Sequence, residues 1–186
     1  MRTDYQALLK EEGVILKGHF LLTSGLHSDV YFEKFRLLEN PGLLSKLLRD
    51  LLHKVNNVDW VVGPTLGGAL IAVEAARILK CKAAYAEREG NRRILKRGFD
   101  IKKNEGIIVV DDVLTTGKSV KETLDLLKSF HISGIFVLID RSGGSVDFGI
   151  PLVSLMQFKV KNYTPEECPM CKKGIPLVTR GGSKNI

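Results

Sequence analysis

The chain has no long hydrophobic run and few cysteines. Its longest apolar candidate, residues 61–73, contains three glycines and a proline. That segment is also shorter than the roughly 18 residues that a membrane span requires. Residues 1–13 carry acidic side chains and no apolar core of the kind found in secretory signals, so we expect no signal peptide there. Three cysteines, an odd and low number, exclude a disulfide framework. These absences predict a cytoplasmic protein with no membrane partner.

The composition is that of a globular protein. The 186 residues are 44% hydrophobic and 26% charged, which excludes disordered and fibrous classes. Lysine and arginine number 28 against 21 acidic residues, and the excess of seven favours an anionic partner. Nucleic acid, a membrane surface and a phosphorylated small molecule all meet that description, and charge alone does not choose among them.

Strand and helix patterns alternate along the middle of the chain. Strands are predicted at 60–62, 82–86, 107–110 and 135–139, with helices at 41–54, from about 68 to 79, and at 119–130. This alternation predicts an α/β fold with a mostly parallel central sheet and flanking helices. Residues 1–40 and about 150–180 do not follow it. We expect them to form a small hood or cap within a single domain spanning residues 1–186.

The strongest motif is IIVVDDVLTTGKS at residues 107–119. A buried strand leads into Asp111 and Asp112, and a loop rich in hydroxyl groups then opens a helix. Ligands of open α/β sheets bind at the carboxyl ends of strands, and helix N-termini bind phosphate. Gly117 allows close backbone approach. Thr115 to Ser119 therefore predict a phosphate cradle.

The two carboxylates would repel a phosphate unless something neutral or cationic lay between, such as a sugar diol or a divalent metal. Phosphate and diol together describe a ribose 5-phosphate. A P-loop is excluded because Asp112 stands where that motif needs its first glycine. The simpler alternative, a buried strand followed by a capped helix, leaves two neighbouring acids without use.

This pattern resembles the phosphoribosyl-diphosphate signature of the type I phosphoribosyltransferases, and nearly the whole chain resembles the orotate phosphoribosyltransferases of a short bacterial branch. Four further segments carry the resemblance: Thr23-Ser24-Gly25 with Ser28 and Tyr31-Phe32; Gly63-Pro64-x-x-Gly67-Gly68; Leu138-Ile139-Asp140-Arg141; and Glu167-Cys168-Pro169-x-Cys171-x-x-Gly174-x-Pro176-Leu177.

The resemblance implies an enzyme that transfers ribose 5-phosphate from 5-phospho-α-D-ribose 1-diphosphate (PRPP) to orotate. The products would be orotidine 5′-monophosphate and diphosphate, in de novo pyrimidine (UMP) biosynthesis. It also implies Mg²⁺ held mainly through the diphosphate, with no dedicated protein metal ligands, and a homodimer in which a mobile lid from one subunit reaches the site of the other.

Site residues follow from the same resemblance, position by position. PRPP would be bound by Arg88, Asp111, Asp112, Val113, Leu114, Thr115, Thr116, Gly117, Lys118 and Ser119. The diphosphate loop would supply Pro64, Thr65 and Gly67, and orotate would contact Tyr31, Phe32, Thr115 and Arg141. The catalytic residues would be Arg88, Lys96, Asp111 and Asp112.

The predicted lid, residues 86–98, departs from the family pattern. It contains five cations but no histidine, and Glu89 and Gly90 stand where a lysine and a histidine are usual. Gly67 and Thr23 also occupy positions where lysine is common. Which lid cation replaces the usual catalytic lysine stays open, and so does the acceptor base.

Cys168-x-x-Cys171 is half of a zinc knuckle, and a structural zinc ion needs four ligands. One chain offers only Cys81 and four histidines besides. Zinc shared across a dimer and a free thiol pair are both open, and His27 could instead contact a ligand of the predicted site.

Two other functions are consistent with the same fold. One is a phosphoribosyltransferase for another base, although a neutral base would leave Arg141 no carboxylate to bind. The other is a PRPP-sensing regulator that binds nucleic acid. Against it, the basic residues gather in one loop rather than along a helix face, so we expect no nucleic-acid partner.

Overall fold

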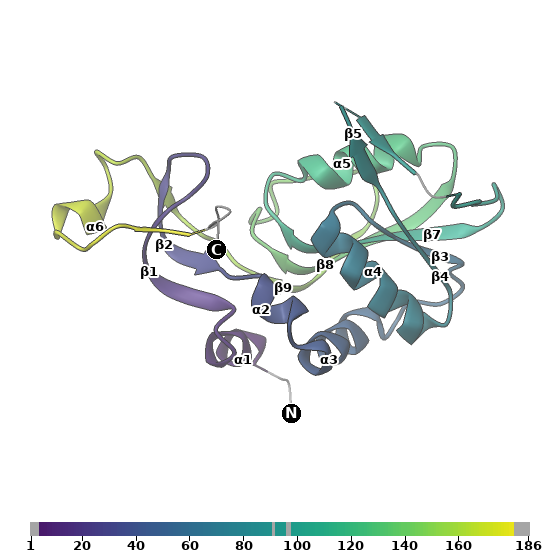
Figure 1. Ribbon diagram of the computed structural model, residues 1–186, viewed down its shortest axis with the longest axis horizontal. Helices are drawn as coiled ribbons and strands as arrows, with labels where there is room; N and C mark the ends of the chain where they lie inside the picture. Colours follow the sequence, from purple (N-terminus) through teal and green to yellow (C-terminus); the bar gives the residue numbers. More distant parts are fainter. Residues whose placement is uncertain (1–3, 91, 96–97, 181–186) are drawn as a thin grey trace. The chain divides into compact units, whose positions relative to one another are not determined.

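The computed structural model describes residues 4–90, 92–95 and 98–180 (Figure 1). The chain divides into two compact units. The first unit contains the described residues up to Arg36 and from Lys159 onward, and the second unit spans Leu37–Phe158. Among the described helices, none has the length and apolar character that crossing a bilayer requires.

The second unit is built on a five-stranded sheet in which every neighbouring pair is parallel. The order is β4 (Lys82–Tyr85), β3 (Trp60–Gly63), β7 (Gly106–Leu114), β8 (His131–Asp140) and β9 (Leu152–Gln157). Its helices are α3 (Pro41–Leu52), α4 (Leu66–Leu79) and α5 (Lys118–Leu126), and α2 (Phe35–Leu38) lies at the boundary of the two units. The predicted α/β class and parallel sheet are therefore confirmed.

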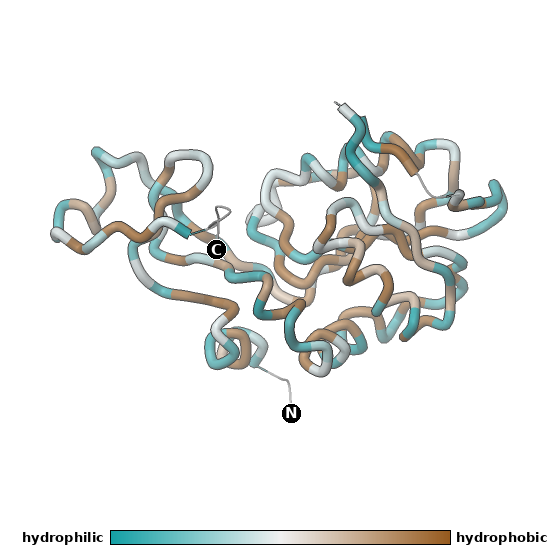
Figure 2. The backbone as a smooth tube through the Cα atoms, viewed as in Figure 1, coloured by the Kyte–Doolittle hydropathy of each residue, from teal (hydrophilic) through white to brown (hydrophobic). Residues whose placement is uncertain are grey.

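Both faces of this sheet are covered. Ile107, Val109 and Ile135 pack with Val120 and Leu127, which lie in and directly after α5. The other helices, α3 and α4, pack against each other and against the strands. Because both faces are buried, the central strands contain long apolar runs, such as Ile107 to Val110 of β7, and Figure 2 shows much of this sheet as hydrophobic.

The helix α3 begins where the sequence predicts, whereas α4 begins at Leu66, within the predicted glycine-rich turn. The side chain of Asn40 accepts a hydrogen bond from the Leu43 amide at 3.1 Å, and Pro41 occupies the first turn of α3. The six leucines of α3 are all buried, which confirms the predicted apolar face: Leu43, Leu44, Leu47, Leu48, Leu51 and Leu52.

Two segments differ from the sequence prediction. Leu152–Gln157, assigned to the cap from the sequence, forms the edge strand β9. Its side chains are mostly only partly buried, so it lacks the apolar run that marks the central strands. The polar segment after β4 contains a short antiparallel hairpin, β5 (Glu87–Glu89) with β6 (Arg92–Ile94).

The first unit contains α1 (Tyr5–Glu11), α6 (Pro169–Lys172) and a four-stranded sheet. The sheet order is β10 (Asn162–Tyr163), β2 (His27–Phe32), β1 (Ile15–Leu21) and β11 (Val178–Thr179). The buried apolar side chains among its described residues are Leu9, Val14, Ile15, Phe20, Val30, Phe32, Cys168 and Met170. The apolar core of this unit is therefore small, and several of its strands are short.

Glu105 makes one part of the second unit sensitive to pH. Its carboxylate accepts hydrogen bonds from the Lys102 amide at 2.7 Å and from Trp60 Nε1 at 2.8 Å, and it lies 3.1 Å from Lys82 Nζ. The Lys102 amide, then Trp60 and Lys82, lower the pKa of Glu105 from 4.5 to about 2. A lowered folded-state pKa adds stability above the unfolded value that is lost as the pH falls through the folded one.

We therefore expect Glu105→Gln to lower the free energy of unfolding at neutral pH. The difference between variant and parent should shrink as the pH falls from about 4.5 to about 2, because both carboxyl and amide are then neutral. Urea unfolding of both proteins, followed by Trp60 fluorescence at several pH values, measures this difference in the free energy of unfolding. A difference that stays constant across this range would contradict the assigned role of the charge.

Candidate active site

The predicted site residues of the second unit lie at the carboxyl ends of parallel strands, where three loops converge. β3 ends at Gly63, β7 continues to Leu114, and β8 ends at Asp140. β7 is longer than the sequence predicts, because Asp111 to Leu114 still pair with β8. Asp111 and Asp112 are thus strand residues, and adjacent strand residues face opposite sides of the sheet.

Asp111 connects two loops. It is only 3% exposed, and its Oδ1 accepts hydrogen bonds from the Asp112 amide at 3.0 Å and from Thr65 Oγ1 at 3.4 Å. Its Oδ2 accepts one from Ser119 Oγ at 3.4 Å. One carboxylate therefore joins the loop after β3 to the loop after β7. Asp112, also 3% exposed, accepts a hydrogen bond from the Val113 amide at 2.7 Å.

The loop after β7 is the segment that the sequence predicts to bind phosphate. Gly117, the N-cap of α5, has φ +72°, and a Cβ there would lie 2.8 Å from Val146 Cγ1 and 2.9 Å from Phe148 Cζ. Glycine is therefore required by both backbone conformation and space. A hollow of about 250 Å³ opens beside it. Its lining includes eight of the predicted PRPP residues, Arg88 and Val113 to Ser119, together with Arg93 and Glu122.

The loop after β3 forms a second helix N-terminus. Thr65 caps α4, since its Oγ1 accepts a hydrogen bond from the Gly68 amide at 3.1 Å. Pro64 and Gly67 are buried in the same turn. A Cβ on Gly68 would lie 2.7 Å from Pro64 Cδ and 3.1 Å from Asp111 Oδ1, so the turn packs directly on the carboxylate. Backbone amides at this N-terminus suit an anion.

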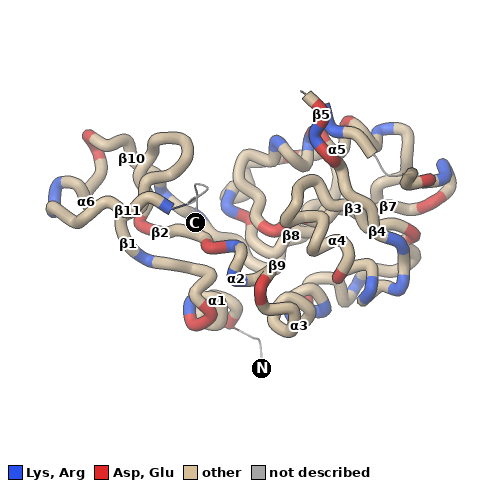
Figure 3. Tube along the Cα trace, viewed as in Figure 1, with Lys and Arg blue, Asp and Glu red and all other residues tan. Residues whose placement is uncertain are grey.

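The lid arginines meet an acidic residue that the sequence analysis missed. Arg88 Nη2 donates to both carboxylate oxygens of Glu122 at 2.9 and 2.8 Å, and Arg93 Nε donates to Oε2 at 3.1 Å. Figure 3 shows basic and acidic residues close together near the labels of β5 and α5. Desolvation opposes ionisation of Glu122, but the hydrogen bonds and charges of Arg88 and Arg93 together outweigh it and lower its pKa. Lys96 lies outside the described residues.

Glu122 follows Ser119 by three positions on α5, which places it on the same face of the helix as the cradle. That spacing was the sequence signal for it. Its carboxylate binds Arg88, the predicted catalytic cation, beside the hollow lined by Val113 to Ser119.

The predicted orotate residues fall in both units. Arg141 directly follows β8, and its amide donates to the Leu114 carbonyl at 2.8 Å, so it lies next to Thr115 in the adjacent strand end. Tyr31 and Phe32 lie on β2 of the first unit, where Tyr31 packs against Phe20 with ring centroids 5.5 Å apart. The predicted contacts of Tyr31 and Phe32 with orotate stay a prediction.

This fold and site define a class of sugar-phosphate transferases, and residues 36–147 match the family described as "Phosphoribosyl transferase domain". Two curated relatives and one solved structure, all orotate phosphoribosyltransferases, show which member of this family the chain is similar to. The orotate phosphoribosyltransferase of Caldanaerobacter subterraneus subsp. tengcongensis is 45% identical over 92% of both chains. That of Thermotoga maritima is 44% identical over 96% of this chain and 97% of its own.

The crystal structure of orotate phosphoribosyltransferase from Aeropyrum pernix superposes with a TM-score of 0.70 at 31% identity, covering 82% of this chain and 93% of that one. The chain belongs to the orotate phosphoribosyltransferase family.

Proposed function

We propose that this protein transfers ribose 5-phosphate from PRPP to orotate, giving orotidine 5′-monophosphate and diphosphate. One observation carries the proposal. Asp111 is hydrogen-bonded to Thr65 at the N-terminus of α4 and to Ser119 in the first turn of α5. Two anion-binding helix ends thus flank one carboxylate. A ligand with a phosphate group at each end and a diol between them matches this arrangement.

The reaction forms a bond between a ring nitrogen of orotate and C1 of the ribose, while the bond from C1 to the diphosphate oxygen breaks. The diphosphate leaves with the electron pair, and the ring-nitrogen proton passes to water. C1 gains positive charge in the transition state, and the buried carboxylate of Asp111 stabilises it while holding the ribose hydroxyls. The part of Asp112 in binding PRPP stays a prediction from the family resemblance. The cradle at Thr115 to Ser119 holds the 5-phosphate and aligns the reacting atoms.

Arg88 completes the site from the lid. Its guanidinium must leave Glu122 to reach the departing diphosphate, since the same donors serve both anions. Glu122 thereby stores Arg88 beside the cradle until a more highly charged anion competes for it. Whether Lys96 or another lid cation assists is part of the same proposal.

We also propose that Mg²⁺ accompanies the diphosphate. Carboxylate and hydroxyl oxygens, the donors at this edge, are the ligands that Mg²⁺ prefers. In the described part of the chain, no third carboxylate, histidine or cysteine joins Asp111 and Asp112 in a metal-binding group, so the substrate would supply most of the ligands. The bound ion would neutralise charge on the leaving group.

A homodimer with the lid acting in trans is a further part of the proposal. Leu66, Leu70 and Val73 are 75%, 50% and 62% exposed, and they follow one face of α4. They line a hollow of about 520 Å³ together with Arg88. An exposed apolar stripe beside the lid favours contact with a second copy.

Mixing Arg88→Ala chains with Asp111→Asn chains should then restore activity that neither variant has alone. The cytoplasmic location stays a prediction of the sequence.

The proposed reaction is tested by incubating the protein with PRPP, Mg²⁺ and one base at a time. Orotate absorbance should fall, while adenine and guanine stay unconsumed. Consumption of a purine with orotate unchanged would favour the alternative base. No reaction with any base, combined with nucleic-acid binding that PRPP alters, would favour the regulator.

Arg141→Ala is expected to raise the KM for orotate about 10- to 100-fold, since a charge-assisted hydrogen bond contributes about 1.5–3 kcal/mol. The KM for PRPP should change far less. Arg141→Lys keeps the charge but loses the planar fork, so it should recover only part of the affinity. Steady-state kinetics with each substrate varied measures this. Equal changes in both KM values would remove the assigned role.

A further inference from the structure

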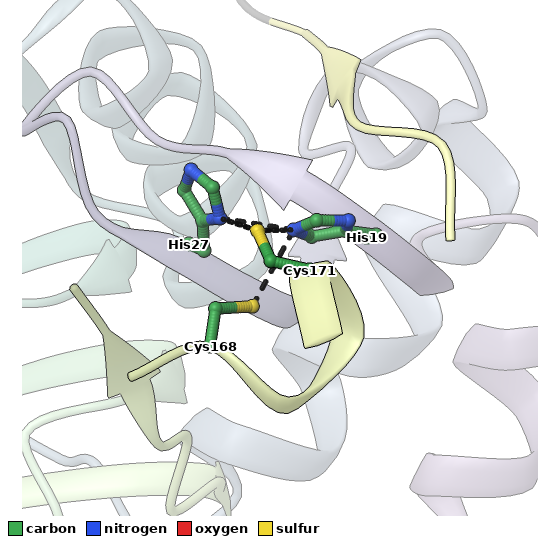
Figure 4. A group of neighbouring side chains, drawn as sticks. All are labelled: His19, His27, Cys168 and Cys171. Atoms are coloured by element: carbon green, nitrogen blue, oxygen red, sulfur yellow. Dashed lines mark hydrogen bonds between the residues drawn. The ribbon is translucent and has the colours of Figure 1, made fainter. Parts of the chain in front are cut away.

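Four metal-ligating side chains meet in the first unit. His19 lies on β1, His27 begins β2, and Cys168 and Cys171 flank the first turn of α6. Their ligand atoms all lie within 4.8 Å of one another. Figure 4 shows the four side chains converging. Among the described residues they form the one group of three or more such side chains able to hold a metal ion.

The three nitrogen–sulfur distances are close to those of ligands around one tetrahedral zinc ion, and the two nitrogens lie somewhat closer together than zinc would hold them. With Zn–N near 2.05 Å and Zn–S near 2.3 Å, tetrahedral angles place two nitrogens ~3.3 Å apart and a nitrogen and a sulfur ~3.6 Å apart. The two nitrogens, His19 Nε2 and His27 Nδ1, are 2.9 Å apart. Cys168 Sγ lies 3.4 Å from His19 Nε2, and Cys171 Sγ lies 3.6 and 3.3 Å from the two nitrogens.

The contact of His19 Nδ1 with a carbonyl shows which ring nitrogen carries the proton. Nδ1 lies 2.8 Å from the Ile175 carbonyl, which can only accept, so Nδ1 carries the hydrogen and Nε2 presents a lone pair. A carbonyl that orients a histidine in this way is the usual support of a metal-bound imidazole. One lone pair can accept one hydrogen bond, yet the thiols of Cys168 and Cys171 and the ring nitrogen Nδ1 of His27 all lie within 3.6 Å of it. A single cation at the centre would satisfy all four.

The local backbone explains how these residues meet. The pairing of β1 with β2 shifts register between Lys17 and Phe20, which is a β-bulge at Gly18 and His19. A β-bulge changes the direction in which nearby side chains point, and this one lies where the His19 side chain contacts His27. On the other side, Cys168 is the N-cap of α6 and Pro169 begins the helix, so the cysteines are one turn apart.

We propose that His19, His27, Cys168 and Cys171 form a structural zinc site within one chain. Two thiolates and two imidazoles are a ligand set that zinc prefers, and four protein ligands leave no open position for substrate. His19, His27 and Cys168 are no more than 4% exposed, which suits a structural role. The two histidines supply the ligands that the sequence left unassigned, so no second subunit is needed.

The site would fasten the C-terminal segment to the β1–β2 hairpin. α6 has four residues and β11 has two, and the first unit has few buried apolar side chains. A cross-link between residues about 150 positions apart, such as His19 and Cys168, closes a long loop and removes much chain entropy from the unfolded state. The proposal is independent of the reaction catalysed by the second unit.

The test measures metal in the full-length protein purified under reducing conditions without chelator. We expect one zinc per chain, and cobalt replacement should give the visible and thiolate-to-metal bands of tetrahedral coordination. Cys171→Ser and His27→Gln should lose the metal. Cys81→Ser and His53→Gln are matched controls outside the group and should retain it.

A second measurement needs no variant. Zinc should protect two of the three thiols from a thiol reagent, and chelation should expose them. Chelation should also speed amide hydrogen exchange in β1, β2 and α6 while leaving β3 and β7 unchanged. The proposal is overturned if the parent protein binds no zinc, if Cys171→Ser binds as much as Cys81→Ser, or if fresh protein contains a Cys168–Cys171 disulfide.

Discussion

Asp111→Asn is expected to lower kcat by about 10²- to 10³-fold, the loss typical when a preorganised charge-stabilising group is removed from an active site. Asparagine has nearly the same shape, so Thr65 and the Asp112 amide can still donate to the oxygen at Oδ1. The substitution removes only the negative charge that we propose faces the ribose. Because positive charge on C1 develops only in the transition state, kcat should fall more than either KM rises.

The matched control is Asp125→Asn, the same change on the exposed side of α5. It should leave kcat within about twofold, as expected for a surface substitution away from the site. Circular dichroism and thermal unfolding of both variants separate a folding defect from a catalytic one. A folded Asp111→Asn protein with the parent's kcat would show that this charge does not act on the ribose.

The parts of the fold that were predictable are those specified by local pattern. Six leucines at helical spacing predicted α3, and the β-branched run Ile107 to Val110 predicted the buried β7. The loop between β7 and α5 was predictable for the same reason, because strand, loop and helix N-terminus are consecutive; that it binds phosphate stays a prediction. Arg141 and Thr115 were assigned to orotate by the family resemblance, and the pairing of β7 with β8 places the two residues at adjacent strand ends.

The parts that were missed depend on contacts between segments far apart in sequence. Glu122 and Arg88 are 34 positions apart, and only the β5–β6 hairpin brings them together. His19 and Cys168 are 149 positions apart. The register shift in β1 beside His19 leaves no trace in the pattern of apolar residues. Such pairings arise from tertiary packing, so a single sequence carries at most a weak trace of them.

Gly63→Ala is expected to destabilise the second unit by about 3 kcal/mol, at the upper end of overpacking effects. A Cβ there would lie 2.2 Å from the Gly68 carbonyl carbon and oxygen and 2.5 Å from the Ala69 amide nitrogen. These are backbone atoms in the first turn of α4, so no side chain can rotate away. The helix start must move, and with it the Thr65 cap that contacts Asp111. The KM for PRPP should therefore rise in any folded fraction.

Gly42→Ala makes the same chemical change where space allows it. Its Cβ would lie 3.6 Å from Asn40 Oδ1, an ordinary contact, and the residue lies within α3. A fitting Gly→Ala substitution stabilises by about 0.4–1 kcal/mol, chiefly by restricting the unfolded chain. Urea unfolding should thus shift the two variants in opposite directions. Equal stability of Gly63→Ala and the parent would mean that the β3–α4 turn opens freely, and the turn would then not hold Thr65 rigidly against Asp111.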